Sequence, residues 1–141
     1  MKHQKISPNE FLIKLEVGDD ILESMKKFAE ELKIEGGVFQ GIGAVQKARL
    51  RVYNTKTKSY EDHEVNEQCE IISLIGNIAK LGKEIIIHAH MGLGKKDLNQ
   101  IGGHVDIGCI VNPMAEIYFK SFDKKIEREK DPATGLNMLK F

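Results

Sequence analysis

The stretch FLIKLEVGDDILESMKKFAEELKIEGG, residues 11–37, joins a strand pattern to a helix pattern and decides the fold class. Phe11, Ile13, Leu15 and Val17 alternate with polar residues, which is typical of a strand with one buried face. Gly18 then breaks the alternation. The sequence therefore predicts a half-buried strand that ends at this glycine.

The second part of this stretch has the spacing of a helix. Its apolar residues form one helical stripe, which consists of Ile21, Met25, Phe28, Ala29 and Leu32. Asp19 or Asp20 can cap the first turn, because a short carboxylate accepts hydrogen bonds from free backbone N–H groups. Gly36 and Gly37 are expected to close the helix, as glycines after a last turn commonly do.

The remainder of the chain predicts strands and no second helix. Strand-like apolar runs cover residues 38–53, 60–65, 69–78, 84–91, 104–111 and 116–122. Residues 54–59 and the Asn112-Pro113 pair are expected to form turns, and Gly41 and Gly43 to bend the long first run. One helix against many consecutive strands indicates an α+β fold with a mostly antiparallel sheet.

The chain length of 141 residues fits a single domain, residues 1–141, with a core over about residues 11–122. Residues 123–141 form a tail that is highly charged up to Pro132. The tail closes on apolar residues that would be unusual if free, so we expect them to dock on the sheet or on a neighbouring subunit; these are Leu136, Met138, Leu139 and Phe141.

Composition limits the classes of partner and the compartment. Lys+Arg and Asp+Glu are equal at 21 each, and only Arg49, Arg51 and Arg128 are arginines, which weakens the case for a nucleic-acid partner. No apolar run approaches the ~20 residues that span a bilayer, so no membrane partner is expected. Cys69 and Cys109 lie in separate apolar runs and are predicted to be buried free thiols, which suits a cytoplasmic location.

Three histidines give the strongest chemical signal. His88-Ala89-His90 is followed by Gly102-Gly103-His104. Residues two apart in a strand point to the same face, so His88 and His90 can present their imidazoles together. The glycine-containing segment between the two motifs can turn the chain and return His104 on an adjacent strand. The alternative is three unrelated histidines at the surface.

Convergent imidazoles predict a divalent metal site. Neutral imidazole binds ions such as zinc well and brings no charge of its own. Three protein ligands leave a fourth position for water or substrate, which is the arrangement found in reactive zinc sites. The expected cofactor is therefore a divalent metal, zinc above the others.

Acidic residues inside apolar runs are candidates for catalysis beside the metal. Glu70 and Glu116 could orient a histidine or act as a general base, and Asp106 could do the same beside His104. The alternative for each is an exposed strand face. Gly41 and Gly43 could permit close approach of a neighbouring strand or of a small ligand.

Several of these segments together resemble one known family. The similarity runs from about Phe11 to about Phe122, and the order of the motifs carries it: residues 39–44 (FQGIGA), 70–78 (EIISLIGNI), 88–91 (HAHM), 102–104 (GGH) and 116–117 (EI). These motifs are similar to the PPC domain (plant and prokaryote conserved), also called the DNA-binding protein with PD1-like motif. The 141 residues contain no Arg-Gly-Arg-Pro AT-hook, so the resemblance is to the prokaryotic stand-alone type.

The resemblance implies a curved antiparallel sheet, a homotrimer and a metal, zinc in prokaryotic members, on His88, His90 and His104. The resemblance implies no particular activity. The predicted function is that of a trimeric metal-binding domain, and the open position on the metal suggests activity on an unidentified small molecule as a metal-dependent enzyme that uses metal-activated water. The alternative is a DNA-associated or regulatory protein, or an assembly module, in which the metal is structural.

Overall fold

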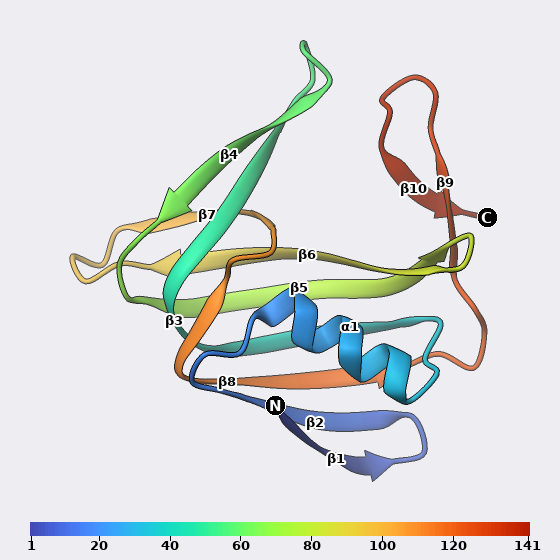
Figure 1. Ribbon diagram of the computed structural model, residues 1–141, viewed down its shortest axis with the longest axis horizontal. Coiled ribbons are helices and arrows are strands. Elements are labelled where there is room, and N and C mark those ends of the chain that lie inside the picture. Colours follow the sequence, from blue (N-terminus) through green and yellow to red (C-terminus); the bar gives the residue numbers. More distant parts are fainter.

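The computed structural model describes residues 1–141, which form one helix packed against one ten-stranded sheet (Figure 1). The helix α1 covers Ile21–Glu31. The strands are β1 Lys2–Ser7, β2 Glu10–Glu16, β3 Gly37–Asn54, β4 Ser59–Val65, β5 Cys69–Leu81, β6 Glu84–Gly94, β7 Gln100–Val105, β8 Ile110–Ser121, β9 Glu127–Lys130 and β10 Asn137–Lys140.

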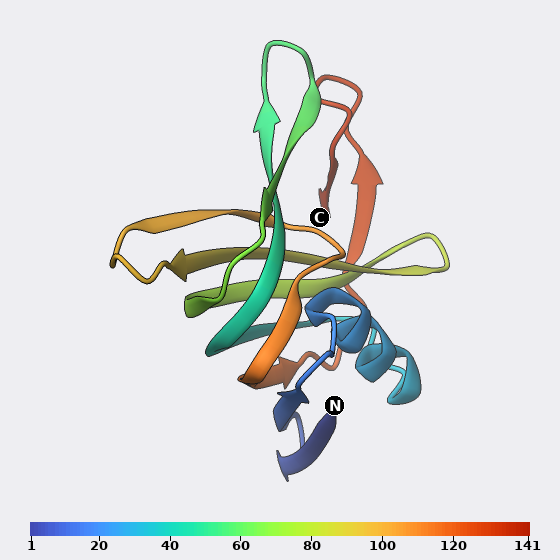
Figure 2. The same cartoon turned by 60° about the vertical axis from the view of Figure 1, so that its left-hand side comes forward.

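The long strand β3 organises the sheet. Its first half lies between β8 and β5, and its second half pairs with β4 and β7. Because β5 also pairs with β6, and β6 with β7, these pairings close a ring and the sheet curves strongly (Figure 2). The one parallel pairing joins Lys80 of β5 to Glu127 of β9. The predicted curved, mostly antiparallel sheet is thereby confirmed, although a single helix is a small part of the fold.

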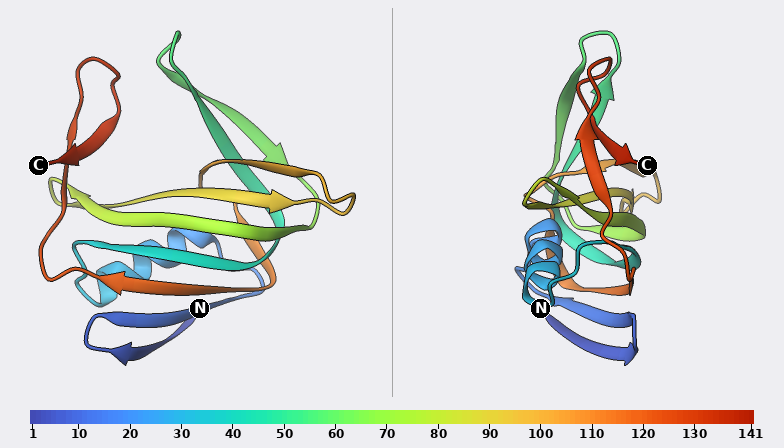
Figure 3. Two further views of the ribbon diagram at one scale, coloured as in Figure 1. Left: turned by 180° about the vertical axis from the view of Figure 1, so that it is seen from behind. Right: turned by 90° about the vertical axis from the view of Figure 1, so that its right-hand side faces the viewer.

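Helix α1 starts where its sequence predicts. Asp20 is the N-cap, and its side chain accepts a hydrogen bond from the backbone N–H of Glu23 at 3.1 Å. The helix lies against one face of the sheet and leaves the other face uncovered (Figure 3). Its end differs from the expectation, because Lys33 takes the left-handed conformation with φ 54° after the last turn. Gly37 instead opens β3.

The core lies between the helix and the sheet. Phe28 of α1 packs edge to face on Phe11 of β2 and Phe119 of β8, with ring centroids 5.4 and 5.2 Å apart. The buried apolar residues of this core run from Phe11 to Phe119. Cys69 and Cys109 are both free and buried, as predicted.

Two expectations about the second half of the chain are wrong. Residues 104–111 are not one strand, since β7 ends at Val105 and β8 starts at Ile110 with a turn between them. Asn112 and Pro113 lie inside β8 and form no turn. Alternation alone does not reveal the turn, because Cys109 is buried within it and keeps the apolar pattern.

The C-terminal tail folds as a β-hairpin of β9 and β10 that stands beside the ends of β5 and β6 (Figures 1 and 3). Ile126, which precedes the hairpin, accepts a hydrogen bond from Lys80 N at 2.8 Å and donates one to Glu35 O at 3.1 Å. The start of the hairpin therefore docks beside β5, but the apolar residues expected to dock do not do so within one chain, because Met138, Leu139 and Phe141 are exposed and β10 pairs with β9 alone.

The structure contains no helix with the length and apolar character needed to cross a membrane.

Candidate metal centre

Strands β6 and β7 bring the three histidines together. His90 and His104 are directly opposite each other in the antiparallel register, and His88 lies two residues before His90 on the same face. The ring centroids are 5.3 Å apart for His88 and His90, 5.1 Å for His88 and His104, and 5.4 Å for His90 and His104. The imidazoles thus form a compact triangle, the histidine cluster, on the sheet face away from the core.

The cluster fits the donor set of a divalent transition metal. One ring nitrogen from each histidine lies within 4.8 Å of the others. Ligands at about 2.0–2.1 Å around a tetrahedral zinc ion are roughly 3.4 Å apart, so small side-chain rotations would close the triangle. Three neutral nitrogen donors suit zinc and its neighbours better than they suit calcium or magnesium, which prefer oxygen.

Burial favours the neutral forms of His88 and His104. Burial lowers the pKa of His104 to about 4, and His88, His90 and Arg51 add to this effect. Burial also lowers the pKa of His88, with smaller contributions from Arg128 and His90. Since a metal competes with protons for imidazole, both shifts leave the ring nitrogens free to bind an ion at neutral pH.

A cavity of about 1080 Å³ opens over the histidine cluster. Strand β3 and the β9–β10 hairpin form its opposite walls, and the hairpin contributes Leu136, Asn137, Met138, Leu139 and Phe141. The cavity floor includes Arg128, which is buried and whose Nη2 lies 3.4 Å from His88 Nδ1. The cluster is therefore open to a small molecule on one side and enclosed by the tail on another.

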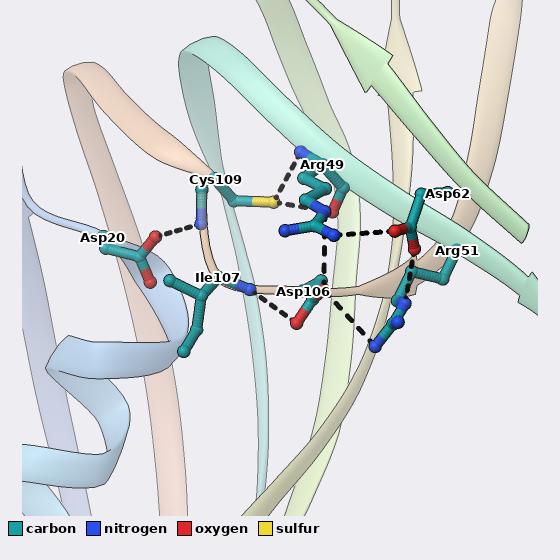
Figure 4. A network of polar contacts seen from close by, with 8 residues as sticks. Asp20, Arg49, Arg51, Asp62, Asp106, Ile107 and Cys109 are labelled. Carbon is teal, nitrogen blue, oxygen red and sulfur yellow. Dashed lines mark hydrogen bonds and ion pairs between the residues drawn. The ribbon is translucent and has the colours of Figure 1, made fainter. Parts of the chain in front are cut away.

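A polar network fixes the β3 side of this site (Figure 4). The Asp62 carboxylate pairs with both arginines, since Oδ2 lies 2.6 Å from Arg49 Nη2 and Oδ1 lies 2.6 Å from Arg51 Nε. Asp106 Oδ2 lies 3.4 Å from Arg51 Nη1. The Arg51 guanidinium lies over the Tyr60 ring at 5.0 Å, and that ring lies 5.1 Å from the His104 ring. The network therefore positions Tyr60 against one of the three histidines.

The predicted acidic residues do not join the histidine cluster. Glu70 on β5 and Glu116 on β8 are exposed, and neither lines the cavity over the cluster. Glu116 borders a separate hollow that also includes Gly41. Asp106 belongs to the arginine network, from which it acts on His104 only through its charge. A catalytic role for Glu70 or Glu116 stays a prediction that contacts within one chain do not support.

The two glycines allow close approach of a neighbouring strand. A Cβ at Gly41 would lie 2.7 Å from the carbonyl oxygen of Glu116, and one at Gly43 would lie 2.5 Å from Ala115 Cα. Gly43 also has φ +147°, and β3 shifts register there against both neighbours. The backbone of β8 occupies the space beside both residues, which favours the strand alternative over a ligand.

Three residues of the site carry no signal in the sequence. Arg128 lies in a charged run that is typical of a solvated tail, and Arg51 and Tyr60 belong to ordinary alternating strands. The apolar C-terminus is the one feature that predicts docking of this segment. Its proximity to the histidines depends on the pairing of β9 with β5, which no local pattern encodes.

Comparison with known proteins gives a family and a fold. The sequence model of the Plants and Prokaryotes Conserved (PCC) domain family matches residues 3–123 of this chain. A solved structure from Bacteroides thetaiotaomicron, described as a "putative DNA binding protein", is 31% identical with a TM-score of 0.94, over 99% of this chain and 96% of that one. A metal-containing protein from Archaeoglobus fulgidus is 29% identical with a TM-score of 0.85, over 98% of this chain and 100% of that one.

A similarity to part of a longer protein accompanies these matches. The bifunctional protein GlmU of a Synechococcus strain is 29% identical over 125 residues, which are 87% of this chain and 19% of that protein. The chain thus spans less than a fifth of the length of the curated relatives it matches. Because the family model extends over residues 3–123, nearly the whole fold, the chain belongs to the Plants and Prokaryotes Conserved (PCC) domain family.

Proposed function

We propose that the protein binds one divalent metal ion, zinc in preference to others, through His88, His90 and His104. The convergence of three ring nitrogens to within 4.8 Å carries this proposal. The lowered pKa values of His88 and His104 support it, because neutral imidazole is the form that binds metal. A family relative of nearly equal length is itself described as metal-containing.

Metal analysis of the purified protein tests the site. We expect about one equivalent of zinc after dialysis of the wild type, and almost none in the triple variant His88→Ala, His90→Ala, His104→Ala. His63→Ala is the matched control, because His63 is an exposed histidine on β4 outside the cluster. Equal metal in the wild type and the triple variant would show that the ligand assignment is wrong.

We propose further that the site acts on a small molecule as a metal-dependent enzyme. A bound zinc ion can polarise a carbonyl group or lower the pKa of water to about 7. The protein supplies a partly enclosed cavity over the cluster, and Tyr60 and Arg128 beside it can orient a ligand. The cavity favours this role over a purely structural metal, since structural zinc sites have four protein ligands and the cluster has three.

The uncovered sheet face supports assembly into a homotrimer. Leu12, Ile42 and Ile75 are 51%, 60% and 63% exposed, and they border a hollow of about 750 Å³ on the face opposite α1. Contiguous apolar surface of this kind marks interaction sites. His90 and Ile75 are direct neighbours in the β5–β6 register, so a subunit that covers this face would also approach the histidine cluster. Light scattering at micromolar concentration measures the assembly; a monomer would refute it.

A DNA-associated or regulatory role is the second candidate, and one specific observation favours it. The Bacteroides relative is described as a "putative DNA binding protein". A gel-shift titration across salt concentrations separates the two functions, because phosphate contacts give a steep salt dependence. We expect no salt-dependent retardation of DNA in the gel, since the chain has 21 basic and 21 acidic residues.

A cytoplasmic location, which the two free thiols suit, stays a prediction.

A further inference from the structure

Arg128 is a buried cation with an incomplete set of partners. Its side chain is 8% exposed although arginine is almost never buried alone. Nη1 donates to the carbonyl oxygen of Asn137 at 2.6 Å, and Nη2 donates to Asn77 Oδ1 at 2.7 Å. Nη2 also lies 3.4 Å from His88 Nδ1, and Nε is buried with no hydrogen-bond partner. All of these partners are neutral.

The acidic groups near Arg128 are bound elsewhere. Glu127 pairs with Lys125 at 2.7 Å, and Glu129 lies 3.7 Å from Lys140. Asp131 accepts hydrogen bonds from the backbone and hydroxyl of Thr134 in the turn of the hairpin. Arg128 forms no ion pair with any of them or with the C-terminal carboxylate. A buried charge without a counter-ion is costly, which indicates that an anion from outside the chain completes this site.

The cavity over the histidine cluster offers a place for that anion. No aspartate or glutamate is among the residues that line it, and the charge of Arg51 on the far wall is already balanced by Asp62 and Asp106. A divalent ion on three neutral histidines would add positive charge next to Arg128. The local field therefore favours a negatively charged ligand over a neutral or cationic one.

The walls of the cavity define the remainder of the ligand. The hairpin contributes Leu136, Met138, Leu139 and Phe141, and β6 contributes Ile86 and Ile87. These side chains can cover an apolar body but offer few partners to a highly hydrated group. An organic acid matches this combination better than inorganic phosphate does, because phosphate has no apolar part to bury.

We propose that Arg128 is the recognition residue for a small organic carboxylate with an apolar body, which binds in the cavity beside the histidine cluster. The planar guanidinium matches the two oxygens of a carboxylate, and a charge-assisted pair in a partly buried site is strong and directional. This inference rests on the proposed function in one respect, namely that the same cavity holds the metal.

Binding of hexanoate tests the proposal, with hexanamide and inorganic phosphate as comparison probes. Calorimetric titration of the zinc-loaded wild type is expected to detect hexanoate and neither of the other two compounds. The same titration on metal-free protein is run in parallel. If the wild type carries no zinc, the proposed metal function fails, whereas binding of hexanoate that depends on Arg128 would still support the carboxylate site.

Two variants remove the recognition in different ways. Arg128→Gln deletes the charge, and Asn77→Asp places a carboxylate on the atom that Arg128 already contacts at 2.7 Å. Loss of a charged hydrogen-bonded pair weakens binding by roughly 10- to 100-fold, so we expect such a loss in both variants. Asn77→Asp is also expected to raise the melting temperature, because it supplies the missing counter-ion, and it covers the case in which Arg128→Gln fails to fold.

Lys27→Gln is the matched control, because Lys27 is an exposed cation on α1 that pairs with Glu31 and does not line the cavity. Its affinity for hexanoate is expected to equal that of the wild type. The proposal is overturned if hexanoate does not bind, if phosphate binds in its place, or if Asn77→Asp and folded Arg128→Gln retain the wild-type affinity.

Discussion

Burial and neighbouring cations lower the pKa of His104 to about 4, and this shift makes the stability of the metal-free protein depend on pH. In the unfolded chain a histidine binds its proton near pH 6.5, whereas folded His104 stays neutral until the pH approaches 4. The unfolded state therefore binds more protons in this interval, and stability is lost as the pH falls from about 6.5 to about 4.

Urea unfolding of metal-free protein at pH 7 and pH 5 measures this effect. The midpoint of the wild type is expected to be lower at pH 5, and the decrease is expected to be smaller in His104→Gln. His63→Gln, a change at an exposed histidine outside the cluster, should leave the wild-type decrease intact. Parallel decreases in the wild type and His104→Gln would contradict the assignment of the shift to His104.

Gly43 is the residue where backbone conformation and close packing coincide. We expect Gly43→Ala to lower the free energy of unfolding by about 1–3 kcal/mol or more, because φ +147° is strained for any side chain and Cβ would meet Ala115. Gly18→Ala is the control: φ is +88° there, but no atom lies within 4 Å of the added carbon. Denaturant unfolding of both variants should give the larger loss at Gly43, and a larger loss at Gly18 would refute the close-packing argument.

At the scale of elements, the N-terminus of α1 connects the helix to the turn between β7 and β8. Asp20 accepts hydrogen bonds from Glu23 N at 3.1 Å and from Gly108 N at 2.6 Å. We expect Asp20→Ala to lower the free energy of unfolding by about 1–2 kcal/mol through loss of the cap. The loss is expected to be larger still because the partly buried N–H of Gly108 is left unpaired. Asp20→Asn keeps an acceptor and should lose less, as thermal unfolding of the two variants would reveal.

The elements also differ in how well the sequence predicts them. Strand β2 and the start of α1 follow from alternation, helical spacing and a capping aspartate, all of which are local signals. The bend of β3 follows from Gly41 and Gly43. Local sequence signals do not predict the turn after Val105 or the β9–β10 hairpin. Both are fixed by contacts between residues distant in the chain, such as those of Asp20 and Lys80.

The residues of the candidate site also differ in how well the sequence predicts them. The spacing of His88, His90 and His104 predicts their convergence, because strand periodicity and one return of the chain are sufficient. Arg128 is beyond such reasoning, since its burial depends on where the tail docks. Glu70 and Glu116 are acidic residues in apolar runs, a pattern that suggests function. Both occupy exposed positions on alternating strands, and their catalytic role stays a prediction.

At the scale of the whole molecule, the exposed sheet face is expected to determine the oligomeric state. Ile75 is 63% exposed at the centre of this face, so Ile75→Lys introduces a charge into the proposed interface with little effect on the core. We expect light scattering to give a lower mass for this variant than for the wild type. Leu98→Lys, a change at an 86% exposed position in the turn between β6 and β7, is the control and should keep the wild-type mass.

The two-sided pairing of β3 has a consequence for the motions of the molecule. Between Gly37 and Val45 the backbone is hydrogen-bonded to β8 on one edge and to β5 on the other, whereas β1 and β10 each have a single neighbour. Deuterium should therefore enter β1 and β10 through local fraying within a short labelling time. Amides in the first half of β3 should exchange last, at the rate at which the entire domain opens.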